Sequence, residues 1–425
     1  MTTARQAGGT PAQVCMTLSA IAAAGATPRP SGETQKEHEQ RIMRGITAQL
    51  GDPGLATGGT WQLQWLGLTP DNGNLAYIAW NSANSGEFAL VVRGTVFSDP
   101  LDLLEDFEVG KTDEFSTGGS SGQVEVAKGS MDAFRRIVEQ QGAQDVGASS
   151  GVTLAQMLDD LTGPKADATV YVTGHSLGGC IATMLGPYLQ QQSWQQVPEF
   201  ALVTFAAPTA GLQDFADYVE SLTWSLQERH VNAYDLVPLA WADIPVAERW
   251  YPTPPGPAAG AGMKALLSTI SKRTNGNVYV QPGAPIVVNS GYSLRDQKEL
   301  QIFLGQVAFQ HANPTYLTLL GAPLTPAGPA VQEVSPTSGP VGTKVTINGS
   351  GFTDDSLVDF GRVPARRADV TIHSPSQITA KAPAGIGDVD VRVTNMIGTS
   401  PAVPGGNSPT PDRCSARSRD HGIKP

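Results

Sequence analysis

Cysteine is scarce in this chain of 425 residues, which contains only Cys15, Cys180 and Cys414. Three thiols so far apart in the sequence form neither a disulfide framework nor a CxxC metal motif. We therefore expect Cys15 and Cys180 to be buried free thiols, and we expect no zinc or iron–sulfur site. This argues against the small disulfide-rich folds and the cysteine-ligated metal centres.

Positive charge and long apolar runs are also in short supply. Lys and Arg number 28 against 39 Asp and Glu, so the formal net charge is −11 at pH 7. A phosphate backbone would be repelled, which argues against nucleic-acid binding. No apolar run approaches the ~20 residues that span a bilayer, so no transmembrane segment is expected. The short apolar run 14–26 favours an N-terminal helix over a signal peptide, since Arg5 is the only charge before it.

Strand-like and helix-like segments, in contrast, alternate along most of the chain. Residues 61–93 have the pattern of three strands joined by Asn/Gly turns, and further strands are expected at 168–174 and 200–208. Helical patterns occur at 12–26, 34–50, 100–107, 130–141, 152–162, 212–222 and from Leu177 onward. Such alternation is typical of a mostly parallel sheet covered by helices on both faces, so the fold class is α/β.

The segment 250–320 interrupts this rhythm before the domain ends. A Pro/Gly loop is followed by an expected helix at 263–276. Two short apolar runs, 278–283 and 285–290, then have the pattern of a hairpin or of edge strands. A terminal helix is expected at 311–320.

The composition changes near residue 322, which indicates a second domain. We assign 1–322 to the α/β domain and 323–330 to a Pro-rich linker. Residues 331–400 show only short strands and turns, which predicts a small all-β sandwich. The tail 401–425 is polar and rich in Pro, Gly, Ser and Arg, so we expect it to be disordered.

The stretch VYVTGHSLGGC (170–180) carries the main chemical signal. A serine between glycines, placed between an apolar strand and a small-residue helix, is typical of the G-x-S-x-G nucleophile elbow. The elbow consists of Gly174, His175, Ser176 and Gly178, and the small residues permit its tight turn. A tight glycine turn with a capping serine is the plain structural alternative.

A serine nucleophile needs a base and an orienting acid, which follow in the order Ser, Asp, His in this type of fold. Asp235 closes an apolar strand where the carboxyl edge of the sheet is expected, and Asp243 is the reserve candidate. His311 precedes the terminal helix and can return over the Ser176 edge. His230 is placed at a strand start, the wrong end of the sheet, and His373 and His421 lie outside the domain.

Two backbone positions are candidates for stabilising an oxyanion. The N–H of Leu177 opens the helix behind Ser176, where the helix dipole favours negative charge. Thr95 follows the apolar strand that ends at Arg93 and Gly94, and it could offer an N–H and a hydroxyl. Arg93 itself is a structural pairing partner in the preferred interpretation and a substrate ligand in the other.

The segments VVRGT, GHSLGG, TFAAP, NAYDLVP and H-x4-YL together resemble the class 3 (fungal-type) triacylglycerol lipase family of α/β-hydrolases. The resemblance covers about residues 14–320. It implies Ser176 as nucleophile, Asp235 as acid, His311 as base, and Thr95 with Leu177 as the oxyanion hole. It implies a lipid ester substrate, possible action at a lipid–water interface, an extracellular location (with the cytoplasm as the alternative), and no metal or organic cofactor.

The chain departs from the family pattern in two places. The segment 126–134 lacks the histidine of the family's V-H-x-G-F sequence, and the interval between Asp235 and His311 is long. The resemblance implies a lid after the oxyanion residue, for which 96–107 is the first candidate and 250–275 the second. An ordinary packed helix is the alternative for 96–107.

The C-terminal segments VSPTSGPVGTKVTINGSGF, DFG and PAGIGDVDVRVTN resemble the IPT/TIG type of immunoglobulin-like domain over 331–400. This resemblance implies a spacer or a module that binds a surface or a polymer. Other functions remain open for the whole chain: a phospholipase A1, a short-chain carboxylesterase or polyester hydrolase, or a non-enzymatic adhesion module with an inactive hydrolase domain.

Overall fold

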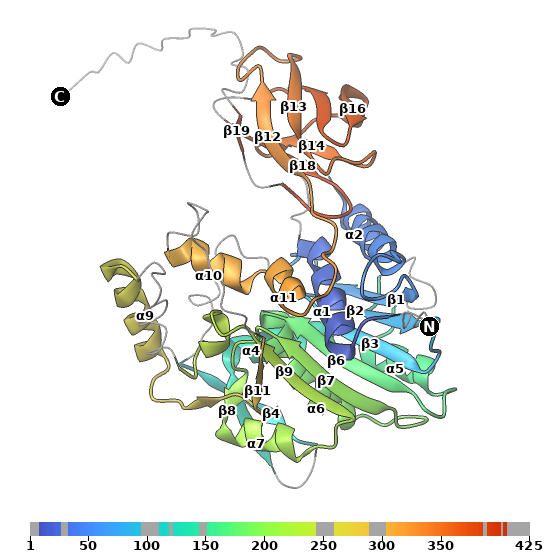
Figure 1. Cartoon of the computed structure of the whole chain (residues 1–425), viewed down its shortest axis with the longest axis vertical. Coiled ribbons are helices and arrows are strands. Elements are labelled where there is room, and N and C mark those ends of the chain that lie inside the picture. Colours follow the sequence, from blue (N-terminus) through green and yellow to red (C-terminus); the bar gives the residue numbers. More distant parts are fainter. Residues whose placement is uncertain are drawn as a thin grey trace, which may run out of the picture. The chain divides into compact units, whose positions relative to one another are not determined.

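The computed structural model describes residues 8–26, 33–94, 110–118, 122–143, 151–243, 259–288, 303–385, 389–400 and 403–405 (Figure 1). The chain forms two compact units. The first contains residues 1–27 and 35–326, and the second contains residues 28–34 and 327–425. Each unit has its own hydrophobic core.

A seven-stranded sheet forms the centre of the first unit. Its strand order is β1-β2-β3-β6-β7-β9-β11. The strands are β1 (Trp61–Leu68), β2 (Leu75–Asn81), β3 (Glu87–Val92), β6 (Thr169–His175), β7 (Glu199–Phe205), β9 (Leu226–Val231) and β11 (Pro285–Val287). The first three strands pair antiparallel, and β3, β6, β7, β9 and β11 pair parallel. The predicted α/β class with a mostly parallel sheet is confirmed.

Helices cover both faces of this sheet, as the apolar strands require. One face packs against α4 (Lys128–Val138), α5 (Leu154–Thr162), α6 (Leu177–Gln190) and α7 (Gln213–Ser221). The other face packs against α1 (Pro11–Ile21), α2 (Gln35–Leu50) and α11 (Asn313–Leu319). Figure 1 shows α1 lying across the strands of the sheet. Strands buried on both sides explain why the sequences of β3, β6 and β7 are almost continuously apolar.

A second, smaller sheet was missed by the sequence analysis. It has the order β10-β8-β5-β4 and contains β4 (Thr112–Ser116), β5 (Gln123–Ala127), β8 (Gly211–Leu212) and β10 (Tyr279–Val280). Strand β10 pairs with β8, whereas β11 pairs with β9 in the main sheet. Within the runs 278–283 and 285–290, Tyr279–Val280 and Pro285–Val287 therefore form edge strands of two different sheets, and the hairpin alternative is wrong.

Other boundaries differ from the predictions by a few residues. The N-terminal helix ends at Ile21 and continues as a 3-10 turn over Ala22–Ala26. The helix expected at 263–276 is α9 (Ala261–Arg273), which buries Leu267 and Ile270 in the core of the unit. The remaining part of the second lid candidate, residues 250–258, and the first lid candidate, 96–107, lie outside the described residues, as does the expected helix 100–107.

The second unit is the predicted all-β sandwich. One sheet has the order β12-β13-β17-β16 and the other β15-β14-β18-β19. The strands are β12 (Ala330–Ser335), β13 (Lys344–Ser350), β14 (Leu357–Phe360), β15 (Val363–Pro364), β16 (Val370–Ser374), β17 (Gln377–Lys381), β18 (Val389–Thr394) and β19 (Val403–Gly405). Strand β19 lies within the tail that we expected to be disordered, because Val403 pairs with Val391 of β18.

Membrane-spanning and metal-binding features are absent from the described part of the chain. No helix there combines the length and apolar character needed to cross a bilayer. Among the same residues, no group of three His, Cys, Asp or Glu side chains is arranged to hold a metal ion.

Candidate active site

Ser176 lies at a sharp bend between β6 and α6. Its backbone has φ 60° and ψ −134°, a conformation that L-residues rarely adopt. The bend is fixed on one side by the Ser176 N–H, which donates to the Phe205 carbonyl at 3.0 Å. Ser176 therefore ends the central strand with its side chain at the carboxyl edge of the sheet.

The glycines around Ser176 are required by contact distance. A Cβ on Gly174 would lie 2.3 Å from the carbonyl carbon of Gly178. A Cβ on Gly178 would lie 2.2 Å from the Val92 carbonyl oxygen. Both neighbours are backbone atoms that cannot rotate away, so only hydrogen fits at either position. The G-x-S-x-G spacing thus follows from the close approach of α6 to β3 and β6.

His311 and Asp235 complete a hydrogen-bonded chain with Ser176. His311 Nε2 lies 2.8 Å from Ser176 Oγ, and His311 Nδ1 lies 2.8 Å from Asp235 Oδ2. The Asp235 side chain is fully buried and the His311 side chain is 14% exposed. A neutral imidazole in this arrangement donates its Nδ1–H to the carboxylate and accepts the serine hydroxyl proton at Nε2.

Asp235 is held from three directions. Its Oδ1 accepts the Val237 N–H at 3.0 Å. Its Oδ2, already facing His311, also accepts the hydroxyl of Tyr316 at 2.8 Å. The same Tyr316 oxygen accepts the Asn232 N–H at 2.9 Å. Burial and the Asp235 charge raise the pKa of Tyr316 well above its usual value, so the phenol stays protonated and donates.

Asn232 joins the Asp235 turn to the helix that carries His311. Its carbonyl oxygen accepts the Asp235 N–H at 2.9 Å. Its side-chain Nδ2 donates to Gln310 Oε1 at 2.7 Å and to the Gln310 carbonyl at 3.0 Å. Gln310 directly precedes His311 at the end of α10 (Phe303–His311). These bonds fix the distance between acid and base although 76 residues separate them in the sequence.

His175 lies beside the His311 ring rather than in the hydrogen-bonded chain. The two ring centroids are 4.7 Å apart, and the His175 and Tyr316 rings meet in a T-shaped contact with centroids 5.3 Å apart. Burial and the neighbouring His311 lower the pKa of His175 well below its usual value, so His175 is neutral near pH 7. Two charged imidazoles at this distance would repel each other, and a neutral His175 avoids that repulsion.

The other sequence-based candidates fall into three groups. Leu177 is the first residue of α6, directly behind Ser176, so its N–H belongs to the free amide groups of a helix N-terminus. Thr95 lies outside the described residues. Asp243, the reserve acid, has no hydrogen bond to the chain of Ser176, His311 and Asp235.

The prediction that His230 lies at the start of a strand was wrong. Strand β9 begins at Leu226, so His230 lies near its carboxyl end, paired with Phe205 of β7. Its imidazole is nevertheless occupied elsewhere, because Nε2 lies 2.8 Å from Glu228 Oε2 and the ring stacks on Phe205. His230 is 4% exposed and makes no bond to Ser176.

Arg93 makes structural hydrogen bonds to the backbone and to one side chain, as the preferred interpretation held. Its guanidinium donates to the Gly25 carbonyl, to Asn72 Oδ1 at 3.0 Å and to the Asn72 carbonyl at 2.5 Å. Burial lowers the pKa of Arg93 to about 9. The Arg93 side chain therefore links Asn72, in the turn between β1 and β2, to Gly25, in the segment after α1.

Both cysteines in the described residues are buried and unpaired, as predicted. Burial raises the pKa of the Cys180 thiol to about 12, which keeps it protonated and unreactive. Cys180 belongs to α6 and packs in the core, 3.4 Å from Ser130 Oγ. Neither thiol competes with Ser176 as a nucleophile.

Comparison with known proteins agrees with this geometry. Residues 89–243 match the family described as lipase (class 3), and residues 329–404 match the IPT/TIG domain. The chain carries a class 3 lipase domain. The matched part of the lipase domain includes Ser176 and Asp235, whereas His311 lies beyond it.

The solved structure of the M37 lipase shares the fold of the lipase domain. The M37 lipase superposes with a TM-score of 0.63 at 22% identity, over 73% of this chain and 92% of that one. A lipase from Rhizopus microsporus var. chinensis aligns with a TM-score of 0.38 at 19% identity, over 55% of this chain and 70% of that one. A class 3 lipase domain implies a lipid ester as substrate.

No role was predicted from the sequence for Tyr316 or Asn232. Both residues belong to the segments NAYDLVP and H-x4-YL, which carry the resemblance to the lipase family, so their presence in these segments could have pointed to them. What the sequence could not provide is the side-by-side placement of these segments, which depends on the packing of α11 against α1 and the sheet. Asn232 and Tyr316 have their polar groups turned toward Asp235 only in the folded chain.

Proposed function

We propose that this protein is a serine hydrolase that cleaves carboxylic ester bonds of lipids, with triacylglycerol as the first substrate to test. One observation carries the proposal. Ser176, His311 and Asp235 form a single hydrogen-bonded chain with both distances at 2.8 Å, at the carboxyl edge of the sheet. This is the arrangement needed to make a serine hydroxyl nucleophilic.

The proposed first step is acylation of Ser176. His311 Nε2 takes the hydroxyl proton as Oγ attacks the ester carbonyl, and a tetrahedral oxyanion forms. Asp235 keeps the imidazole oriented and stabilises its positive form. The Leu177 N–H donates to the oxyanion, and Thr95 is the proposed second donor. Loss of one such donor typically lowers turnover by about 10²–10³.

Collapse of this intermediate breaks the ester C–O bond. The proton on His311 passes to the leaving alcohol, and the acyl group stays on Ser176. Water, deprotonated by the same imidazole, then attacks the acyl carbon and releases the fatty acid. Each step uses only side chains and backbone groups of this chain together with water.

Replacement of the nucleophile tests the proposal. Ser176→Ala is expected to abolish hydrolysis of p-nitrophenyl esters and labelling by a fluorophosphonate, with an unchanged circular dichroism spectrum. Ser221→Ala, which removes an exposed serine hydroxyl on α7, is the matched control and should keep full activity. Retention of more than a few per cent of turnover by Ser176→Ala would place the nucleophile elsewhere.

Substrate class is decided by a panel of esters. Emulsified triacylglycerols, phospholipid vesicles and soluble short-chain esters are compared at equal enzyme concentration. We expect the highest rates on triacylglycerols. A preference for phospholipids or for soluble short-chain esters would assign the protein instead to the phospholipase A1 or the carboxylesterase class.

A further inference from the structure

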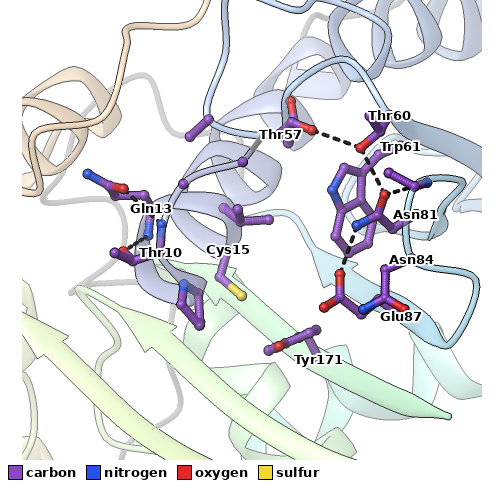
Figure 2. A pocket seen from close by; sticks show the side chains of 16 residues that line it. Thr10, Gln13, Cys15, Thr57, Thr60, Trp61, Asn81, Asn84, Glu87 and Tyr171 are labelled. Carbon is purple, nitrogen blue, oxygen red and sulfur yellow. Dashed lines mark hydrogen bonds between the residues drawn. The ribbon is translucent and has the colours of Figure 1, made fainter. Parts of the chain in front are cut away.

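A second cavity lies in the lipase domain at the opposite edge of the sheet from Ser176. Its volume is about 560 Å³, and its walls come from α1, from the segment before β1, and from the ends of the strands (Figure 2). Tyr171 in the wall precedes Ser176 by five residues on β6, which corresponds to about 16 Å of extended strand. The cavity has no residue in common with the proposed active site.

The strand side of the cavity is a rigid chain of hydrogen bonds. Thr60 Oγ1 donates to Asn81 Oδ1 at 2.8 Å, and Asn81 Nδ2 donates to Glu87 Oε2 at 2.8 Å. The Ala83 N–H also donates to Asn81 Oδ1. Figure 2 shows this chain facing the side chains of α1 across the cavity. The Glu87 carboxylate is therefore held in one orientation without any bound molecule.

Several polar groups in the wall keep hydrogen-bonding capacity. Within the described part of the chain, the indole Nε1–H of Trp61, the hydroxyl of Tyr171 and Oε1 of Glu87 make no hydrogen bond. Trp61 is only 4% exposed and pairs with Asn81 in the strand register. Two donors and one acceptor thus belong to residues that line one cavity, where each group gains from a polar ligand.

The charges around the cavity select a neutral ligand. Among the residues that line it there is no Lys, Arg or His, and Glu87 would repel an anion. A cation would be opposed by the N-terminal end of α1, which begins at Pro11 in the wall. Hydroxyl groups, which both donate and accept, match the indole, phenol and carboxylate together.

The Cys15 thiol in the cavity wall is not suited to form a covalent bond with a ligand. The thiol is 1% exposed, and burial raises its pKa well above the usual value. A protonated, buried thiol is a poor nucleophile. The cavity is therefore suited to reversible binding.

We propose that this cavity binds a small neutral polyhydroxy compound, between glycerol and a monosaccharide in size. The ring face of Tyr171 packs against its carbon skeleton, while Trp61 contributes only its indole N–H. Its hydroxyl groups donate to Glu87 and accept from the indole and the phenol. The proposal is independent of the chemistry at Ser176.

The test is a binding titration of the full chain with glucose and with glycerol, followed by calorimetry and saturation-transfer NMR. Glu87→Gln and Trp61→Phe should each weaken binding by about tenfold or more, because Glu87→Gln replaces the acceptor Oε1 with an N–H donor and Trp61→Phe removes the indole N–H donor. Glu139→Gln, an exposed glutamate elsewhere, is the matched control and should bind as the unmodified chain does. Hydrolysis of a soluble ester should be unchanged in all three variants, which also checks that they are folded.

Choline and inorganic phosphate are the charged comparison probes. We expect neither to bind or to displace glucose. Three results would each overturn the proposal. Neither glucose nor glycerol binds; Glu87→Gln and Trp61→Phe bind glucose as tightly as the unmodified chain does; or choline or phosphate binds more tightly than glucose. If Trp61→Phe is unstable, Asn84→Ala at the exposed rim replaces it, and weaker glucose binding by that variant is required.

Discussion

A single phenolic oxygen connects the acid of the proposed triad to its surroundings. The Tyr316 hydroxyl donates to Asp235 Oδ2 and accepts the Asn232 N–H, and all three residues are buried. In the low dielectric of the interior, a carboxylate that faces an imidazole on one side needs a second donor to keep its position. Tyr316 is thus placed to orient Asp235 and, through Asp235, the His311 imidazole.

Tyr316→Phe is expected to lower kcat about tenfold with little change in KM. The substitution keeps the ring but leaves the Asn232 N–H without its acceptor and Asp235 Oδ2 with one donor fewer, at a cost of about 1–3 kcal/mol in stability. Steady-state kinetics on a soluble ester and a thermal melt measure both effects.

Tyr188→Phe is the matched control for this experiment. Tyr188 lies 12 residues after Ser176 on α6, about 18 Å along the helix, and its hydroxyl makes no hydrogen bond within the described residues. Its kcat should equal that of the unmodified chain. An unchanged kcat in Tyr316→Phe as well would show that Tyr316 has no part in positioning the acid.

At the scale of the element, the strand–turn–helix of β6 and α6 is determined by contact between backbones. The sequence alone was sufficient to predict this element, because only glycine permits such an approach and the spacing of Gly174 and Gly178 is local. The hairpin β4–β5 was not predictable in the same way. Its strands TDEFS and QVEVA are short and carry charges, and they are fixed by pairing with β8 from a distant part of the chain.

Gly178→Ala is expected to destabilise the lipase domain and to abolish activity. The new methyl group would lie 2.2 Å from the Val92 carbonyl oxygen, so the cost should exceed the ~1–3 kcal/mol typical of overpacking. Gly262→Ala on α9 is the control, since no atom lies within 4 Å of its Cβ and alanine favours a helix. A Tm that is equal for the two variants would contradict the contact argument.

At the scale of the whole molecule, the chain consists of two units with separate cores. Composition was enough to predict this division, because the change to short strands after the Pro-rich segment is abrupt. The position of His311 relative to Ser176 was predicted from its place before the terminal helix, by setting the other downstream histidines aside, and from the family resemblance. Periodicity identifies a helix near His311, but it does not show which edge of the sheet that helix approaches.

Removal of residues 327–425 is expected to leave hydrolysis of soluble esters unchanged within about twofold. Among the described residues, the hydrogen bonds of Ser176, His311, Asp235 and Tyr316 all have their partners within residues 1–326, so the site needs no group from the second unit. The measurement is kcat/KM of the truncated and full chains on a soluble ester. A large loss would show that the sandwich contributes to the substrate cleft.

The N-terminal and C-terminal helices of the lipase domain, α1 and α11, contact each other. Gln13 Nε2 of α1 donates to the Leu320 carbonyl at 2.9 Å, just after α11, and α1 and α11 share one core with Tyr316. On a ribosome, the proposed nucleophile Ser176 and acid Asp235 emerge well before the proposed base His311 and the helix that anchors it. A growing chain therefore stays inert toward the lipids of the cell that makes it until nearly the whole domain has been synthesised.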